Sequence, residues 1–105
     1  MIEVAKIAGK NCLQRNTTKE TNGGEAVRMV IEENWEKEEN ILVSFDAVET
    51  ATSSFIDEAI AKLLNTHSLD ELKQKLRFPG INDDFKQKIN KSIYLRSIKS
   101  DGKQE

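Results

Sequence analysis

The apolar segment Ile41–Phe45 is the feature that most constrains the fold. Only Ser44 interrupts its large apolar side chains, and such a run is typical of a strand that is covered on both faces. We therefore expect a central strand. Helical spacing of apolar residues before and after this segment predicts an α/β fold, because each crossover helix returns its apolar stripe to the same sheet.

Two helices are predicted beside the central strand. The first covers residues 24–36, and Asn22 with Glu25 is placed as its capping pair. The second begins at or beside the Ser53–Ser54 pair, whose second residue makes a capping arrangement with Asp57. Their apolar stripes consist of Val27, Val30, Ile31 and Trp35 in the first helix and of Ile56, Ala59, Ile60, Leu63 and Leu64 in the second.

Two further helices are predicted downstream. Ser68 and Glu71 cap the first, and Asn82 or Asp83 caps the second. Between them, residues 77–80 have room for a brief strand, which the proline in this segment confines to an edge or an end. The apolar stripes consist of Leu69, Leu72 and Leu76 in the first helix and of Phe85, Ile89 and Ile93 in the second.

The amino-terminal segment predicts a hairpin. Apolar and polar residues are interleaved over residues 2–7, which indicates a first strand, and residues 12–15 can return as its short antiparallel partner. Residues 16–22 are polar and are expected to form an exposed loop. The complete pattern predicts a small mixed sheet of about four strands with an opening hairpin and about three to four helices.

Length and composition indicate one domain. The chain has 105 residues, of which 37% are hydrophobic, enough for one core and too few for two. We assign residues 1–99 to this domain and residues 100–105 to a polar, disordered tail. A net charge of −2, with no spanning segment or signal-peptide pattern, predicts a cytoplasmic protein that binds neither nucleic acid nor membranes.

The single cysteine and the single histidine limit the chemistry. Cys12 cannot form an internal disulfide, and Cys12 with His67 does not make a zinc site. We expect Cys12 to be a small buried side chain and His67 to lie in a surface turn. No catalytic residue, metal ligand or cofactor is predicted.

Charge is distributed unevenly along the chain. Residues 32–39 are rich in glutamate, whereas the carboxyl-terminal half carries the basic residues Lys73, Lys75, Arg77, Lys86, Lys88 and Lys91. This asymmetry can orient a protein partner, and a solvated surface explains it equally well.

The hydroxyl residues Thr52, Ser53 and Ser54 lie between the central strand and the second helix. Loops at the carboxyl ends of strands are where α/β sheets collect ligands and regulatory groups. A phosphate here would add roughly −1.5 to −2 charges beside a helix amino terminus, which favours anions. The simpler interpretation is that a serine or the threonine caps the helix, which contributes about 1 kcal/mol by itself.

Three carboxylates, those of Asp46, Asp57 and Glu58, are expected near these hydroxyl groups. Paired carboxylates can perform acid and base chemistry, but no histidine, cysteine or lysine is placed to complete a nucleophile, so capping and solvation are expected. Arg28 lies one turn from both Glu25 and Glu32, which predicts a solvated ion pair, with a partner contact as the alternative.

The Gly23–Gly24 pair precedes the first predicted helix. Glycines at a helix start can hold phosphate, but this segment lacks the remaining residues of a phosphate-binding motif, and Glu25 would repel an anion. We therefore expect the two glycines to be a flexible start of the helix.

Three segments, Gly24–Arg28, Ile41–Asp46 and Ser53–Ala59, together resemble a known family. Their pattern is a Gly-Glu-x-x-Arg helix start, an apolar strand that ends in an acidic residue, and Ser-Ser-Phe-x-Asp/Glu-Glu-Ala. It is similar to the STAS-like domain family of unknown function, and the resemblance extends from about Gly23 to Ile93. It implies a STAS-like α/β fold.

The resemblance also implies a function. In anti-sigma factor antagonists of the wider superfamily, a serine at the amino end of this same helix is phosphorylated, and the domain binds a kinase-like anti-sigma factor. By this similarity Ser53 is the candidate phosphoacceptor, with Ser54 next. The sequence departs from the antagonist pattern at Thr52, where an aspartate is expected, and at Phe55, where a glycine is expected.

We therefore hypothesise a non-catalytic regulatory module, bacterial or phage-encoded, that binds another protein such as a histidine-kinase-like ATPase or an anti-sigma factor. The candidate contact residues are Asp46, Thr52, Phe55, Asp57, Glu58 and Arg28. One alternative is a nucleotide-binding sensor that uses the same helix terminus. Another is a homodimeric structural subunit whose opening hairpin pairs with a copy of itself.

Overall fold

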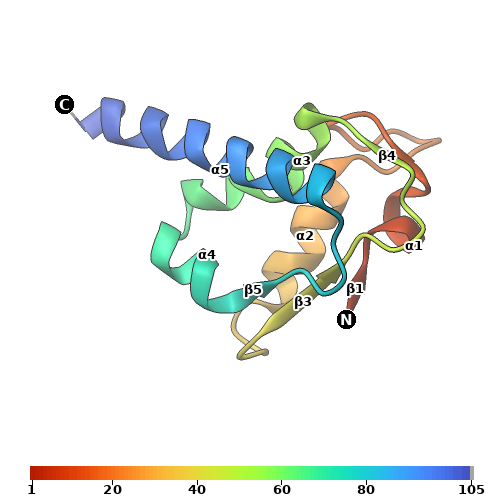
Figure 1. Cartoon of the computed structure of the whole chain (residues 1–105), viewed down its shortest axis with the longest axis horizontal. Coiled ribbons are helices and arrows are strands. Elements are labelled where there is room, and N and C mark those ends of the chain that lie inside the picture. The colour runs from red at the N-terminus through yellow and green to blue at the C-terminus, as the bar shows by residue number, and fades with distance from the viewer. Residues whose placement is uncertain (105) are drawn as a thin grey trace.

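The structure is a computed structural model, and it describes the backbone of residues 1–104 and the side chains of residues 1–98. Helices pack beside two small sheets, and the strands β1, β3 and β5 lie along the lower edge of the view in Figure 1. The elements in chain order are β1 (Ile2–Glu3), α1 (Val4–Ala8), β2 (Asn11–Cys12), α2 (Gly24–Asn34), β3 (Ile41–Ser44), β4 (Thr50–Ala51), α3 (Ser53–Ala59), the 3₁₀ helix η1 (Ala61–Asn65), α4 (Leu69–Lys75), β5 (Leu76–Arg77) and α5 (Asp83–Gln104).

The predicted central strand is confirmed, because β3 lies between β1 and β5 in a three-stranded sheet. Both pairings are parallel, with Ile2 opposite Val43 on one side and Ile41 opposite Leu76 on the other. Parallel neighbours require long crossovers, and the segments that contain α2 and α3 provide them. One face of β3 is less covered than expected, since Leu42 is exposed.

The predicted opening hairpin is wrong. Only Ile2–Glu3 is a strand, and the chain then turns into α1, in which Val4 and Ala8 are buried one helical turn apart. Apolar residues at positions 4, 7 and 8 satisfy helical spacing as well as alternation over so short a segment. The homodimer hypothesis therefore loses the hairpin on which it rested.

The single mixed sheet is not what forms. Residues Asn11–Cys12 pair with β4 in a separate two-stranded sheet, in which Asn11 lies opposite Thr50. This pairing is also parallel. The α/β class is confirmed, with five α-helices in place of the expected three to four and two small parallel sheets among the described residues.

The core combines buried side chains from elements along the whole chain, among them α2, α3 and β3. Of the stripe predicted for α2, Val27, Ile31 and the cap residue Trp35 are buried, and Val30 is partly buried. Val43 of β3 is also buried. Helix α3 packs against both α2 and α5.

The prediction that Cys12 is a small buried side chain is confirmed. Burial raises the pKa of its thiol to about 11.

His67 lies at the predicted break between helices, but its ring is only partly exposed rather than on the surface. The ring stacks on Trp35 with centroids 3.8 Å apart, and Nε2 lies 2.5 Å from Glu32 Oε1. These contacts join the end of η1 to α2, so the histidine has a packing role.

The predicted helix caps have mixed outcomes. Ser68 and Glu71 form a capping box at α4, and Asn82 Oδ1 accepts the Phe85 N–H at the start of α5, as expected. The Asn22–Glu25 pair is wrong, because the α2 cap is a glycine without a side-chain hydrogen bond and the Asn22 amide instead donates to Ile7 O.

Helix α5 begins on the core and then extends past the other elements (Figure 1). Its first turns bury Phe85 and Ile89, and Lys88 Nζ donates to Ala51 O at 3.0 Å. The backbone of α5 continues to Gln104, whereas the side chains of residues 99–105 lie outside the described residues. The expected tail at residues 100–105 stays a prediction.

Candidate functional site

Ser53 and Ser54 are the first two residues of α3, and both are exposed. The predicted capping arrangement of Ser54 with Asp57 is wrong, whereas a hydroxyl residue of this segment does cap the helix. The cap is Thr52, whose Oγ1 accepts the Phe55 N–H at 3.1 Å and donates to Leu13 O at 3.2 Å. Because the threonine provides the cap, helix capping does not explain why serines stand at positions 53 and 54.

Asp57, one turn further along α3, holds two arginines. Arg15 Nη1 and Arg96 Nη2 each lie 2.6 Å from Asp57 Oδ2, and Arg96 Nε lies 3.1 Å from Oδ1. Arg15 comes from the loop after β2, and Arg96 comes from α5. One carboxylate therefore connects α3 to two segments that are distant in the sequence.

The environment of Asp57 favours the charged carboxylate. Partial burial by itself raises the pKa of Asp57, but the hydrogen bonds and charges of Arg96 and Arg15 outweigh this effect, and the pKa lies below its ordinary value. The aspartate is thus an anchor for two cations and is a poor general acid near neutral pH.

The two serines and this cluster line one shallow cavity of about 320 Å³. Its remaining lining residues are Ser92 and Leu95, both from α5. The cavity therefore combines exposed hydroxyl groups with two guanidinium groups and one carboxylate. Guanidinium groups bind phosphate oxygens with bidentate geometry, so a phosphate on either serine would have cations nearby.

A second ion cluster joins α3 to α2. Arg28 Nη1 contacts Glu58 Oε2 and also donates to Glu58 O at 2.7 Å, and Lys62 Nζ lies 3.1 Å from Glu58 Oε2. The Glu58 side chain is 4% exposed. Burial raises its pKa, but Arg28 and Lys62 outweigh burial, so the pKa lies below its ordinary value. The predicted solvated pairing of Arg28 with Glu25 or Glu32 is wrong.

The predicted flexible helix start at Gly23 and Gly24 is wrong, because both glycines lie in close contact with neighbouring backbone. A Cβ on Gly24 would lie 2.5 Å from Phe55 O, and one on Gly23 would lie 2.5 Å from Asn16 O. The first N–H groups of α2 are also occupied: Gly24 N donates to Gln14 O at 3.0 Å, and Glu25 N donates to Arg15 O at 2.9 Å. A phosphate would find these donors already bonded.

The structure brings together some of the candidate residues and separates others. Ser53, Ser54 and Asp57 share the cavity, whereas the ring of Phe55 is completely buried in the core. Asp46 is exposed after β3 and does not line this cavity. Of the three carboxylates expected around the hydroxyl groups, only that of Asp57 lies in the cavity.

Sequence reasoning missed Arg15 and Arg96 as members of the site. They lie 42 and 39 positions from Asp57, so no local spacing connects them to it. They are identified only by the tertiary packing, in which α5 and the loop that follows β2 both contact α3.

Two classes of feature are absent from the described part of the chain. Within it, no group of three or more histidine, cysteine, aspartate and glutamate side chains is arranged to hold a metal ion. No described helix combines the length and the apolar character needed to cross a membrane.

Comparison with known proteins identifies the family. No curated protein and no solved structure matches the chain. The family described as a STAS-like domain of unknown function matches residues 23–86, which is more than half of the chain and includes α2, β3, α3 and the Arg28–Glu58 pair. The chain therefore belongs to the family of STAS-like domains of unknown function.

Proposed function

We propose that this chain is a non-catalytic regulatory module that binds another protein through the surface around Ser53 and Ser54, and that phosphorylation of one of these serines switches the contact. One observation carries the proposal: two exposed serines share a cavity with Arg15 and Arg96 while Thr52 performs the capping. The hydroxyl groups are accessible to a kinase, and the two arginines can bind the phosphate group of the resulting phosphoserine.

The arginines suggest how the switch would work. A phosphoserine carries about −1.5 to −2 charges at neutral pH and makes strong hydrogen bonds to arginine. It would compete with Asp57 for Arg15 and Arg96, and it would also repel the Asp57 carboxylate. Because Arg15 belongs to the loop after β2 and Arg96 to α5, the modification would alter both segments beside the serines.

The proposed partner is a histidine-kinase-like ATPase or an anti-sigma factor. This choice rests on the resemblance of residues 53–59 to the phosphorylated helix of anti-sigma factor antagonists and on the accessible serines. Thr52 belongs to the proposed contact surface as the partly exposed cap of α3. Asp46, which is exposed between β3 and β4, is proposed as a further contact outside the cavity. The proposal needs no chemical step by this chain other than receipt of the phosphate.

The test compares tagged proteins in affinity capture from the native host, with mass spectrometry of the bait and of the captured proteins. The variants are Ser53→Asp/Ser54→Asp, which imitates the charge, and Ser53→Ala/Ser54→Ala, which removes the acceptors. The matched control is Gln74→Glu/Gln87→Glu, which adds the same two negative charges at exposed helical positions outside this cavity.

We expect phosphoserine at position 53 or 54 of the wild-type bait. We also expect a kinase-like partner that is captured by the wild type and by the control but is lost with the aspartate variant. Equal capture by all variants together with an unmodified bait would refute the switch. A substrate turnover that Asp46→Asn abolishes would refute the non-catalytic assignment.

A further inference from the structure

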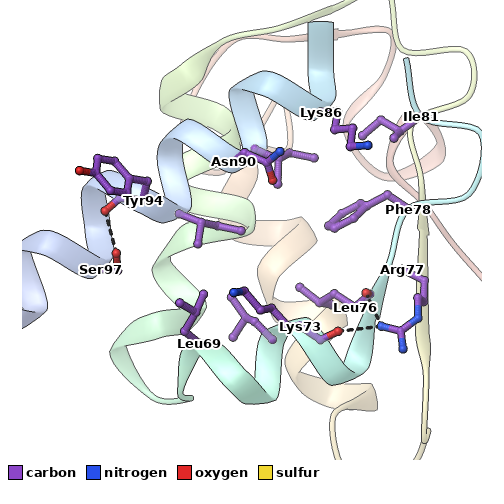
Figure 2. Close-up of a pocket in the computed structure, with 13 residues that line it drawn as sticks. Leu69, Lys73, Leu76, Arg77, Phe78, Ile81, Lys86, Asn90, Tyr94 and Ser97 are labelled. Carbon is purple, nitrogen blue, oxygen red and sulfur yellow. Dashed lines mark hydrogen bonds between the residues drawn. The ribbon is translucent and has the colours of Figure 1, made fainter. Parts of the chain in front are cut away.

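A second concave surface lies between α4, β5 and α5, and we call it the α4–α5 groove. It has a volume of about 530 Å³ and is distinct from the serine cavity, with which it shares no lining residue. Figure 2 shows side chains from both helices and from the strand turned towards the same space. The apolar lining includes Leu69, Leu72, Phe78, Ile89, Ile93 and Tyr94.

The charges of the groove all have one sign. Lys73, Arg77 and Lys86 line it, and no carboxylate does. The Arg77 guanidinium donates to Lys73 O at 2.8 Å and to Leu76 O at 2.9 Å (Figure 2), so it is positioned by backbone carbonyls rather than neutralised by an acid. Among the described side chains, none of the three cations has a salt-bridge partner.

This concentration of positive charge contrasts with the whole chain, whose net charge is −2. A patch whose sign is opposite to that of the molecule as a whole attracts a partner of complementary charge and excludes like-charged ones.

Apolar surface continues along α5 beyond the groove. Tyr94 lines the groove and is 63% exposed, and Ile98, one turn later, is 47% exposed. A small molecule confined to the groove would leave Ile98 uncovered. The continuation therefore favours an extended occupant that follows the helix.

We propose that the α4–α5 groove binds an acidic amphipathic helix of a partner protein. Its lining comes from two helices, from the edge strand β5 and from the segment that follows this strand. An amphipathic helix can lay its apolar face into such a groove. Leucine-type side chains would contact the apolar lining, and carboxylates at the margins would lie near Lys73, Arg77 and Lys86.

The same charges argue against a second copy of this chain as the occupant. A two-fold interface places the same surface patch on both subunits, so the three cations would face identical cations across the interface. The concave shape also fits a helix better than the surface of a bilayer, which would contact only the rim.

The test uses a synthetic peptide with leucine at every third or fourth position and glutamate elsewhere, and a matched peptide in which lysine replaces glutamate. Calorimetry with the full chain should detect binding of the glutamate peptide, weakened at about 0.5 M salt, and no binding of the lysine peptide. The double variant Lys73→Glu/Lys86→Glu should reduce affinity at least about tenfold, because each reversal replaces attraction by repulsion.

Two control variants separate this proposal from the serine switch. Tyr94→Ala, at an exposed position, should also weaken peptide binding while leaving the fold intact. Ser53→Asp/Ser54→Asp should leave peptide binding unchanged, since neither the serines nor Arg96, the α5 cation beside them, lines the groove. A failure of the serine switch would thus have no effect on this measurement.

Three outcomes would overturn the proposal. The first is equal affinity for the two peptides or binding of neither. The second is binding to anionic phosphatidylglycerol vesicles in place of the glutamate peptide, which would identify a membrane surface. The third is a dimer in sedimentation analysis that Tyr94→Ala dissociates, which would identify a second copy as the occupant.

Discussion

Arg96 and Asp57 form a bidentate ion pair across the interface between α5 and α3. The Nη2–Oδ2 and Nε–Oδ1 distances are 2.6 Å and 3.1 Å, and the side chains are 21% and 16% exposed. Asp57 Oδ2 also accepts a hydrogen bond from Arg15. The bidentate geometry and partial burial distinguish this pair from ordinary surface ion pairs, which contribute little.

Replacing Arg96 by methionine should lower the free energy of unfolding by about 1–3 kcal/mol, because the partly buried carboxylate loses its bidentate partner. Urea denaturation measures the change. The control is Lys6→Met, which removes a pair with Glu3 that is largely exposed and should change stability by less than about 0.5 kcal/mol. An equal effect of the two substitutions would show that the Arg96 pair is an ordinary surface contact.

The two carboxylates on α3 should make stability depend on pH in the acid range. In the folded chain the pKa values of Asp57 and Glu58 lie below the ordinary values of 3.8 and 4.5, so the unfolded chain binds protons at higher pH than the folded chain. Their contribution is therefore fully present above about pH 5 and is lost as the pH falls through the folded pKa values.

Thermal unfolding between pH 6 and pH 3 tests this dependence. The double variant Asp57→Asn/Glu58→Gln should be less stable at pH 6, and its midpoint should fall less on acidification than that of the wild type. The control Glu49→Gln, at an exposed position, should keep the wild-type dependence. If the double variant also keeps it, these ion clusters are not the source of the acid sensitivity.

The cap assignment separates Thr52 from the two serines. Thr52→Ala should destabilise the domain by about 1 kcal/mol, because the Phe55 N–H loses its acceptor at the start of α3. Ser53→Ala and Ser54→Ala should each stay within about 0.5 kcal/mol of the wild type, since both side chains are exposed. Denaturant unfolding of the three variants checks this order, and a larger loss with either serine would return the capping role to it.

Several elements could be predicted from the sequence because their determinants are local. The apolar run of β3 and the stripe of Val27, Ile31 and Trp35 predicted buried positions, with Leu42 as the exception, and the Ser68–Glu71 capping box needs only residues three positions apart. These features depend on neighbours along the chain, so no knowledge of the packing was required.

The rest depended on contacts between distant segments. The apolar residues in positions 2–8 fit the alternation of a strand and the spacing of a helix equally well. The segment forms the helix α1, in which Val4 and Ala8 are buried. The β2–β4 pairing and the arginines on Asp57 connect residues about 40 positions apart, beyond the reach of periodicity. The candidate serines could therefore be named from the sequence, but their cationic surroundings could not.

Gly24 should resist substitution even though alanine favours a helix more than glycine does. Propensity alone predicts that Gly24→Ala stabilises α2 by up to about 1 kcal/mol. The added Cβ would instead lie 2.5 Å from Phe55 O and 3.0 Å from Ala59 N. Both atoms belong to the backbone of α3, so the two helices would have to separate.

We expect Gly24→Ala to destabilise the domain by about 1–3 kcal/mol, the usual cost of overpacking a well-packed contact. Urea unfolding measures it against Met29→Ala, an exposed position of the same helix, which should change stability by less than about 0.5 kcal/mol. Because Glu58 Cβ is also 3.0 Å from the added atom, the separation should loosen the Arg28–Glu58 pair and reduce the acid sensitivity of unfolding. A stabilised Gly24→Ala variant would mean that the start of α2 is free to move away from α3.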